Sequence, residues 1–296
     1  MMLITTPTGD IGTRVLAHVL DAGKEARVIA RNPARLPEAV RSRVDIFEGS
    51  HADPAVIVPA LSGVDAVFWL PPGNLDAQDA ETAYCEFSRA FCDALRGSPV
   101  RRVVGISALG RGWPKPAGQV SATIQVDDMI AGTGVHYRAL TCASLMDNLL
   151  RQVDLIRTEG VFYQPVPQDL KLPHVAKSDV ARTAARLLEH TEWTGVDEVP
   201  LHGPENLTYD QMAEILSEAL KRPIRFREIS MEAFGDLLRS TGCTEGMARA
   251  AMEMMIAKSE GMDTMTRPES RSATPTSFQT WCENELRPVI EYQENS

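Results

Sequence analysis

The sequence lacks any apolar run near the roughly 18 residues that a membrane-spanning helix needs, so we expect no membrane span. Its start leads directly into a strand-like segment, Met2–Thr5, without the basic region and apolar stretch of a secretory signal. The five cysteines include no C-x-x-C pair, which favours reduced thiols in a cytoplasmic protein. Basic residues (30) are fewer than acidic ones (40). This imbalance argues against a nucleic-acid partner, because binding a phosphate backbone requires a basic face.

Short apolar runs alternate with helical patterns through the first half of the chain. Nearly continuous apolar runs are typical of strands covered on both faces in a parallel sheet. Two helices are predicted between them, Ile11–Ala22, which stops at Gly23, and Ala77–Leu95. The predicted fold class is α/β, a Rossmann-type doubly wound parallel sheet with right-handed crossovers. We expect its strands at Met2–Thr5, Ala26–Ala30, Val44–Phe47, Ala66–Leu70, Arg102–Ser107 and Val135–Thr141.

The pattern changes after about residue 150. Thr208 and Gln211 fit a capping box for a helix over Tyr209–Leu220, and Ser230 and Thr244 fit the N-caps of two more helices. We therefore expect a Rossmann domain over residues 1–150 and a smaller, mostly helical lobe over residues 151–296. Some segments of that second part are expected to return to the sheet.

A glycine-containing turn lies between the first expected strand and the first helix. Gly9 and Gly12 stand where close approach to a pyrophosphate and tight helix packing require glycine, and Thr6 takes the place of the usual first glycine. The helix N-terminus adds free N–H groups and a partial positive charge. The turn therefore predicts a dinucleotide site, and an ordinary strand–helix turn is the simpler alternative. The expected contacts are Thr6, Thr8, Gly9, Asp10, Ile11 and Gly12.

The second expected strand ends in Arg31, where NAD-binding folds place a carboxylate for the ribose 2′-hydroxyl. A guanidinium group suits a 2′-phosphate instead, through charge-assisted hydrogen bonds, and Asn32 can add another. The predicted cofactor is therefore NADP(H). A solvated surface arginine is the alternative.

Two further strand ends are expected at the same edge of the sheet. Leu70, Pro71 and Pro72 follow the fourth strand, and Ser107 ends the fifth. Open α/β sheets bind their ligands at the carboxyl ends of their strands. We expect all four residues to contact the cofactor, with Ser107 facing the nicotinamide or the substrate. A serine that only caps the strand end is the alternative for Ser107.

The chain resembles the NmrA-like family of atypical short-chain dehydrogenase/reductases over nearly its whole length. The family's G-x-T-G-x-x-G turn is matched except at Thr6, and its arginine after strand 2 corresponds to Arg31. Gly49–Asp53 loosely matches the family segment in which an aspartate approaches the adenine, and Ser50 stands in its place. Further similar blocks are Tyr137–Asn148, Lys177–Ala181 and Gly203–Thr208.

The standard proton-transfer pair of the wider superfamily is missing. No tyrosine has a lysine four residues later, and Gln119–Asp128, where that pair is expected, has neither residue type. Alcohol–ketone chemistry by that route is therefore not expected. The resemblance implies NADPH-dependent reduction of a quinone-like or conjugated small molecule, since some relatives reduce quinones or triphenylmethane dyes. A non-catalytic NADP(H)-sensing regulator that binds a partner protein, and a non-redox tailoring enzyme, stay open.

Candidate catalytic and substrate-binding residues lie after the fifth and sixth strands and in the lobe. His174 follows Lys171, Leu172 and Pro173 in a segment that we expect to be a polar loop, where it can donate or accept a proton; a solvated loop histidine is the simpler alternative. The C-terminal methionines, from Met247 to Met265, indicate either an apolar packing helix or a flexible lid over an apolar or aromatic substrate. No histidines have metal-ligand spacing, so no metal site is expected. A homodimer or a partner protein stays open. The catalytic candidates are His174, Ser107 and Tyr163; the substrate-pocket candidates are Trp113, Met146, Asn148 and Phe162.

Overall fold

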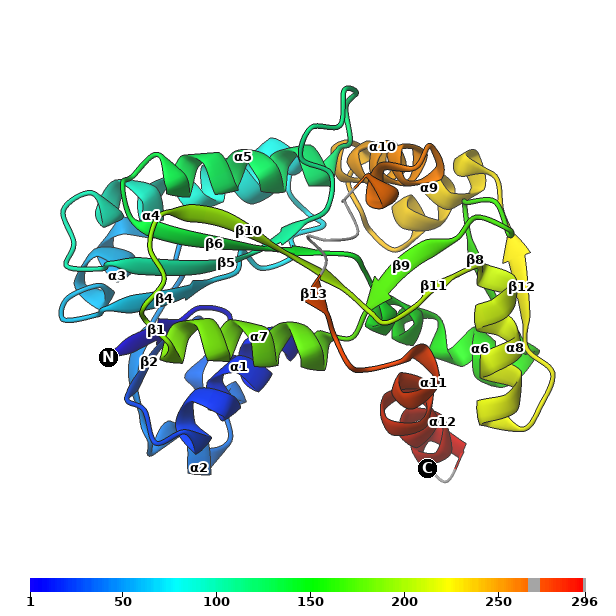
Figure 1. The fold of residues 1–296 in the computed structure, drawn as a ribbon, viewed down its shortest axis with the longest axis horizontal. Coiled ribbons are helices and arrows are strands. Elements are labelled where there is room, and N and C mark those ends of the chain that lie inside the picture. Colours follow the sequence, from blue (N-terminus) through cyan, green and yellow to red (C-terminus); the bar gives the residue numbers. More distant parts are fainter. Residues whose placement is uncertain (266–271, 295–296) are drawn as a thin grey trace.

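A parallel sheet of eight strands forms the centre of the protein (Figure 1). The computed structural model describes residues 1–265 and 272–294. The strand order is β13-β10-β6-β5-β4-β1-β2-β3, and the α/β fold class is thereby confirmed. The six predicted strands are all present, with ends shifted by at most one residue. The strands are β1 (Met2–Ile4), β2 (Ala26–Ala30), β3 (Val44–Glu48), β4 (Ala66–Trp69), β5 (Arg102–Ala108), β6 (His136–Cys142), β10 (Val196–His202) and β13 (Ser272–Ala273).

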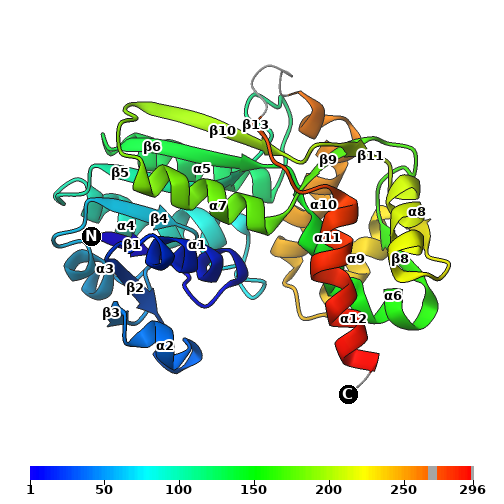
Figure 2. The same cartoon turned by 60° about the horizontal axis from the view of Figure 1, so that its bottom comes forward.

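One face of the sheet is covered by α1 (Asp10–Asp21) and α7 (Lys177–Glu189), which lie side by side (Figure 2). Their apolar residues, among them Val15 and Val180, pack with the sheet into a single core cluster. Although α7 follows residue 150 in the chain, it belongs to this layer, as β10 and β13 belong to the sheet. The short α2 (Glu38–Arg41) lies beyond them, next to β3.

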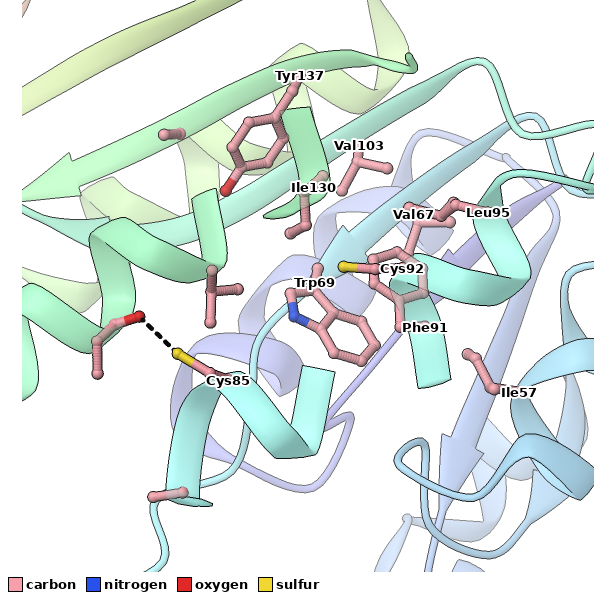
Figure 3. Packing of buried hydrophobic residues seen from close by; sticks show 14 of the residues in the cluster. Ile57, Val67, Trp69, Cys85, Phe91, Cys92, Leu95, Val103, Ile130 and Tyr137 are labelled. Atoms are coloured by element: carbon pink, nitrogen blue, oxygen red, sulfur yellow. Dashed lines mark hydrogen bonds between the residues drawn. The ribbon is translucent and has the colours of Figure 1, made fainter. Parts of the chain in front are cut away.

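The opposite face is covered by α3 (Pro54–Ala60), α4 (Phe87–Leu95) and α5 (Gln119–Ala131). Trp69 of β4 stacks on Phe91 of α4 with 3.9 Å between ring centroids, in the middle of this layer (Figure 3). The predicted helix Ala77–Leu95 starts late. Residues 71–79 form a loop, and Glu81–Glu86 form a π-helical turn before α4. The two prolines and the glycine at positions 71–73 keep the start of this segment out of a helix.

The lobe combines helices with two small sheets. It contains α8 (Tyr209–Leu220), α9 (Met231–Ser240) and α10 (Glu245–Ser259), and Thr208, Ser230 and Thr244 cap them as predicted. The capping hydroxyls accept hydrogen bonds from backbone N–H groups of the first helical turn. In the chain's described part no helix is long and apolar enough to cross a membrane. The remaining elements are η1 (Pro33–Arg35), β7 (Ser144–Leu145), η3 (Met146–Gln152), α6 (Val153–Glu159), β8 (Val161–Gln164), β9 (Leu172–Val175), β11 (Asn206–Leu207), β12 (Arg225–Glu228), η4 (Met262–Thr264), α11 (Phe278–Trp281), η6 (Cys282–Leu286) and α12 (Arg287–Glu294).

Candidate functional site

The turn between β1 and α1 is held in a conformation that normally requires glycine. Thr6 has a φ of +49°, in the left-handed region that a β-branched residue rarely adopts. Its hydroxyl donates to the Leu70 carbonyl oxygen at 2.8 Å, which ties the turn to the end of β4. Thr6 therefore supplies the backbone shape of the missing glycine and adds a hydrogen bond that glycine lacks.

The position of Gly12 leaves no room for a side chain. A Cβ atom there would lie 2.0 Å from the Thr6 carbonyl oxygen. Gly9, by contrast, would place its Cβ 3.5 Å from the same oxygen, an ordinary contact. Gly12 thus allows the close packing of α1 against the turn, whereas Gly9 borders the space in front of the helix.

Replacement of Thr6 by glycine tests this account of the turn. Relief of the left-handed strain, about 1–2 kcal/mol, offsets the lost hydrogen bond and the greater freedom of the unfolded chain. We expect Thr6→Gly to change the free energy of unfolding by less than about 1 kcal/mol. Thr6→Ala keeps the strain and loses the bond, so it should be less stable by about 1 kcal/mol. Urea unfolding measures both free energies. An equal loss of stability in the two variants would show that the backbone at Thr6 is not strained.

The N-terminus of α1 opens onto a cleft of about 510 Å³ at the carboxyl ends of β1, β2, β4 and β5. Gly9 caps α1 without a side-chain hydrogen bond, so the first N–H groups of the helix are directed to this cleft. Such N–H groups, with the helix dipole, bind anionic groups.

Four basic side chains line the cleft although the whole chain is acidic. They are Arg31, Arg35, Arg151 and Lys177, and Asp10 is the carboxylate that accompanies them. Lys177 Nζ lies 2.7 Å from Asp10 Oδ2, and this hydrogen bond with its charge attraction lowers the pKa of Asp10. The cleft therefore has an excess of positive charge, which suits a ligand with several phosphates.

A second cavity of about 220 Å³ adjoins the cleft on the side of the lobe. The two share Ile106, Ser107, Ala108 and Leu145, so they meet at the end of β5. Most of the second cavity is apolar. Its apolar walls include Val120, Leu149, Met146, Met212, Met254 and Met255.

His174 lines this cavity from β9 and not from the polar loop that we predicted. Its side chain is buried, with the ring edge-on to Tyr209 at 5.7 Å. Nδ1 donates to the Leu172 carbonyl oxygen at 3.1 Å, which leaves the lone pair on Nε2. Burial, helped by the nearby Lys258 ammonium, lowers the pKa of His174 to about 4. At neutral pH the ring is therefore uncharged and accepts hydrogen bonds through Nε2.

Lys258 of α10 also lines the cavity, and its charge is paired. Its Nζ lies 2.5 Å from Oδ2 of Asp263, whose side chain is fully buried. Because the pair is enclosed, its low-dielectric surroundings strengthen the attraction between the two charges. The ammonium adds a positively charged hydrogen-bond donor to a wall that is otherwise largely apolar.

Ser107 lies at the junction of cleft and cavity and is bonded to a buried carboxylate. Its hydroxyl donates to Asp127 Oδ2 at 2.5 Å, and the Tyr137 hydroxyl donates to Oδ1 at 2.6 Å. Gly105 of β5 makes room for Tyr137, since a Cβ there would lie 2.2 Å from the tyrosine oxygen. Burial raises the pKa of Asp127 to about 6, despite the two hydroxyl donors that lower it.

A profile of the family described as NAD(P)H-binding matches residues 7–191. This match spans more than half of the chain and includes the turn from Pro7 onward, the basic cleft residues and Ser107. The chain belongs to the NAD(P)H-binding family.

Two relatives of this family member are named reductases. It is 29% identical over 235 residues, 79% of the chain and 78% of the relative, to a (4-alkanoyl-5-oxo-2,5-dihydrofuran-3-yl)methyl phosphate reductase of Streptomyces griseus. It is 25% identical over 255 residues, 86% of both chains, to an NAD(P)H azoreductase of Xenophilus azovorans. The fold is also that of an NADPH-dependent quinone oxidoreductase from Escherichia coli, solved with NADPH, with a TM-score of 0.80, 21% identity and full coverage of both chains.

Of the twelve residues predicted to contact the cofactor of this NAD(P)H-binding protein, ten line the cleft. Gly12 lies beneath the turn, where it permits packing. Asn32 is directed elsewhere, because its side-chain oxygen accepts from the Ala34 N–H at 3.0 Å and caps a short turn. The ten are Thr6, Thr8, Gly9, Asp10, Ile11, Arg31, Leu70, Pro71, Pro72 and Ser107.

The predicted substrate residues divide into two groups. Met146, Asn148 and His174 line the second cavity together with Ser107. Phe162 is completely buried behind Tyr209, and Trp113 packs against a separate small cluster next to α10. Neither lines the cavity, and nor does Tyr163, whose backbone pairs with the Gln152 side chain. In the chain as described, no group of histidine, cysteine and acidic side chains is arranged to hold a metal ion.

Sequence reasoning missed several residues that the fold of this NAD(P)H-binding protein brings to the site. Arg35 lies four residues after Arg31, in the short turn Pro33–Arg35, and a second arginine so close to the first was an available signal. Arg151 and Lys258 stand in segments whose position relative to the sheet no local pattern indicates. The missed residues are Arg35, Arg151, Lys177, Tyr209 and Lys258 along the walls, and Asp127 behind Ser107.

Proposed function

We propose that the protein is an NADPH-dependent reductase of a quinone-like or otherwise conjugated small molecule. The observation that carries this proposal is the junction at Ser107, where a basic dinucleotide cleft adjoins a methionine-lined cavity. A reductase of this kind must place an apolar, flat acceptor against the nicotinamide ring, and this junction offers the place for both.

The residues present fit the phosphorylated dinucleotide. Arg31 and Arg35 stand where a 2′-phosphate on the adenosine ribose is bound, and the N-terminus of α1 with Lys177 and Arg151 suits the pyrophosphate. When bound, the reduced nicotinamide supplies a hydride. The protein's own part is to bind and orient the two partners and to exclude water from the cavity.

The cavity walls favour a conjugated acceptor over a simple ketone. Methionine side chains adapt to flat ring systems and make favourable contacts with them. Donors to a carbonyl or azo group of the acceptor are at hand in Lys258, Asn148 and Tyr209, which line the same space. The relatives point the same way, since their names describe an azoreductase and a reductase of an unsaturated lactone phosphate.

A panel of acceptors under pre-steady-state conditions tests the function. Benzoquinones, naphthoquinones, azo dyes, triphenylmethane dyes and an alkanoyl butenolide phosphate are mixed with protein and NADPH, and oxidation of NADPH is followed. We expect turnover with at least one of these classes. Binding of NADPH without oxidation by any of them would reject the reductase and support the NADP(H)-sensing hypothesis.

Filling the cavity tests where the acceptor binds. Met254 lines the cavity from α10, while Ile256 on the same helix is exposed. We expect Met254→Trp to lower kcat/KM for the acceptor by about tenfold or more, because the larger side chain occupies acceptor space. The Kd of NADPH should stay unchanged. Ile256→Trp is the matched control, and equal kcat/KM in both variants would place the acceptor elsewhere.

A further inference from the structure

Asp127 is a buried carboxylate that the proposed function leaves without a role. It lies on α5, and its side chain is 3% exposed. Each of its oxygens accepts one hydroxyl hydrogen bond, from Ser107 at 2.5 Å and from Tyr137 at 2.6 Å. A carboxylate in an apolar layer costs free energy, and a buried carboxylate with a raised pKa beside a cleft is a candidate for a functional role.

The carboxylate lies between the interior and the outer surface. On one side its partner Ser107 borders both the cleft and the cavity. On the other side Asp127 itself lines a separate depression of about 340 Å³, together with Arg111 and Glu198. A chain of polar atoms thus runs from that depression, through Asp127 Oδ2, to the Ser107 hydroxyl at the junction.

We propose that Asp127 delivers, through the Ser107 hydroxyl, the proton that the reduced acceptor takes up, and regains it from solvent through the depression at Arg111 and Glu198. This proposal rests on the proposed function. It replaces the absent tyrosine–lysine pair, expected on α5, with an aspartate on α5 and a serine at the end of β5. Asp127 acts through Ser107, so it is a positioning and proton-supplying residue, and Ser107 is the group that meets the acceptor.

The proton balance of the step is simple. A quinone-like acceptor that has gained a hydride carries a negative charge on oxygen and needs one proton. As the new O–H bond of the product forms, the Ser107 O–H bond breaks, and the Asp127 Oδ2–H bond breaks as the serine regains its hydrogen. Asp127 is left as a carboxylate, which the Tyr137 hydroxyl at Oδ1 and the Arg111 guanidinium, 3.9 Å from Oδ2, stabilise.

The surroundings of Asp127 allow it to hold a proton near neutrality. Burial raises its pKa to about 6, and Glu198 on β10 adds to that rise. The hydroxyl donors Ser107 and Tyr137 and the Arg111 guanidinium lower it. Because the acid form is the one that donates, turnover limited by this step should fall as the pH rises above about 6.

The pH profile of kcat/KM tests the relay, with the acceptor that the panel identifies. We expect the wild-type value to fall about tenfold per pH unit above the Asp127 pKa, since a single proton is required. Asp127→Asn and Ser107→Ala should lower kcat/KM by about 100-fold at pH 6 and remove that pH dependence. The Kd of NADPH should be unchanged in Asp127→Asn, because Asp127 does not line the cofactor cleft, and circular dichroism checks that each variant is folded. Asp93→Asn, an exposed carboxylate paired with Arg96, is the control.

Tyr137→Phe separates a relay from a merely structural carboxylate. Loss of the Tyr137 donor removes stabilisation of the charged form, so the pKa of Asp127 should rise and the falling limb should move to higher pH. Carbon-13 NMR of the labelled aspartate carboxyl measures the same shift without cofactor or acceptor. A titration near pH 4 in the wild type, or one that Tyr137→Phe does not move, would overturn the relay.

The outcomes distinguish this proposal from the function on which it rests. If the wild type oxidises NADPH and Asp127→Asn does so with the same rate and profile, only the relay is wrong. If none of the acceptors in the panel supports NADPH oxidation by the wild type, the proposed reductase function is wrong, and the relay proposal is rejected with it.

Discussion

Replacing Gly12 with alanine is expected to abolish NADPH binding and to destabilise the protein. The new Cβ would lie 2.0 Å from the Thr6 carbonyl oxygen and 2.7 Å from its carbon, and both are backbone atoms. The turn cannot move away freely, because Thr6 is hydrogen-bonded to Leu70 and the preceding Thr5 hydroxyl to the Phe68 carbonyl oxygen at 2.9 Å. We expect the free energy of unfolding to fall by about 3 kcal/mol, at the upper end of the cost of overpacking.

Gly9→Ala is the matched comparison for this prediction. Its Cβ would meet the same oxygen at 3.5 Å, so the folded turn tolerates it, and the free energy of unfolding should change by less than about 1 kcal/mol. Thermal unfolding and fluorescence titration with NADPH measure the two variants. Wild-type stability and affinity in Gly12→Ala would show that α1 does not pack against the turn as described.

We expect the wild-type protein to bind NADPH more tightly than NADH, and Arg31→Ala to bind the two cofactors with similar affinity. A lost charge-assisted contact is worth about 1.5–3 kcal/mol, so the Kd of NADPH should rise by roughly 10- to 100-fold. The Kd of NADH should change little, because NADH has no phosphate at this position. Arg35 lines the same end of the cleft, so Arg31→Ala with Arg35→Ala should cost more than either change alone.

Fluorescence titrations at one ionic strength measure these affinities, since salt screens the exposed charges of the cleft. Arg41→Ala is the control, because Arg41 is paired with Glu38 on α2 and does not line the cleft. An equal loss of affinity for NADPH and NADH in Arg31→Ala would reject the assignment of the 2′-phosphate to this end of the cleft.

The basic cleft shows how little the net charge of the chain says about a local site. An excess of ten negative charges is compatible with four basic side chains around one cleft. Arg31 was identifiable because the end of a second strand is a fixed place in a Rossmann fold. Arg151 was not, because it comes from the turn between β7 and α6, and only packing of the lobe against the sheet brings it near α1.

His174 illustrates a different failure of local reasoning. Its neighbours Lys171 and Pro173 suggest an exposed loop, yet residues 172–175 form a buried strand that pairs with β7 and β11. The pairing partners stand about 30 residues away on either side, so no local pattern predicts the strand. Burial then lowers the pKa of His174 to about 4 and makes the ring an acceptor, not the proton donor that its residue type suggests.

Local pattern alone predicts six of the eight strands of the parallel sheet, the turn after β1 and the arginine after β2. Each of these depends on the periodicity of one segment or on a short spacing along the chain. The tertiary structure decides the shape of the methionine-lined cavity, the burial of His174 and the pairing of Ser107 with Asp127. The cavity alone is lined by side chains as far apart in the chain as Ile106 and Lys258, about 150 residues, and these come together only once the helices have packed on the sheet.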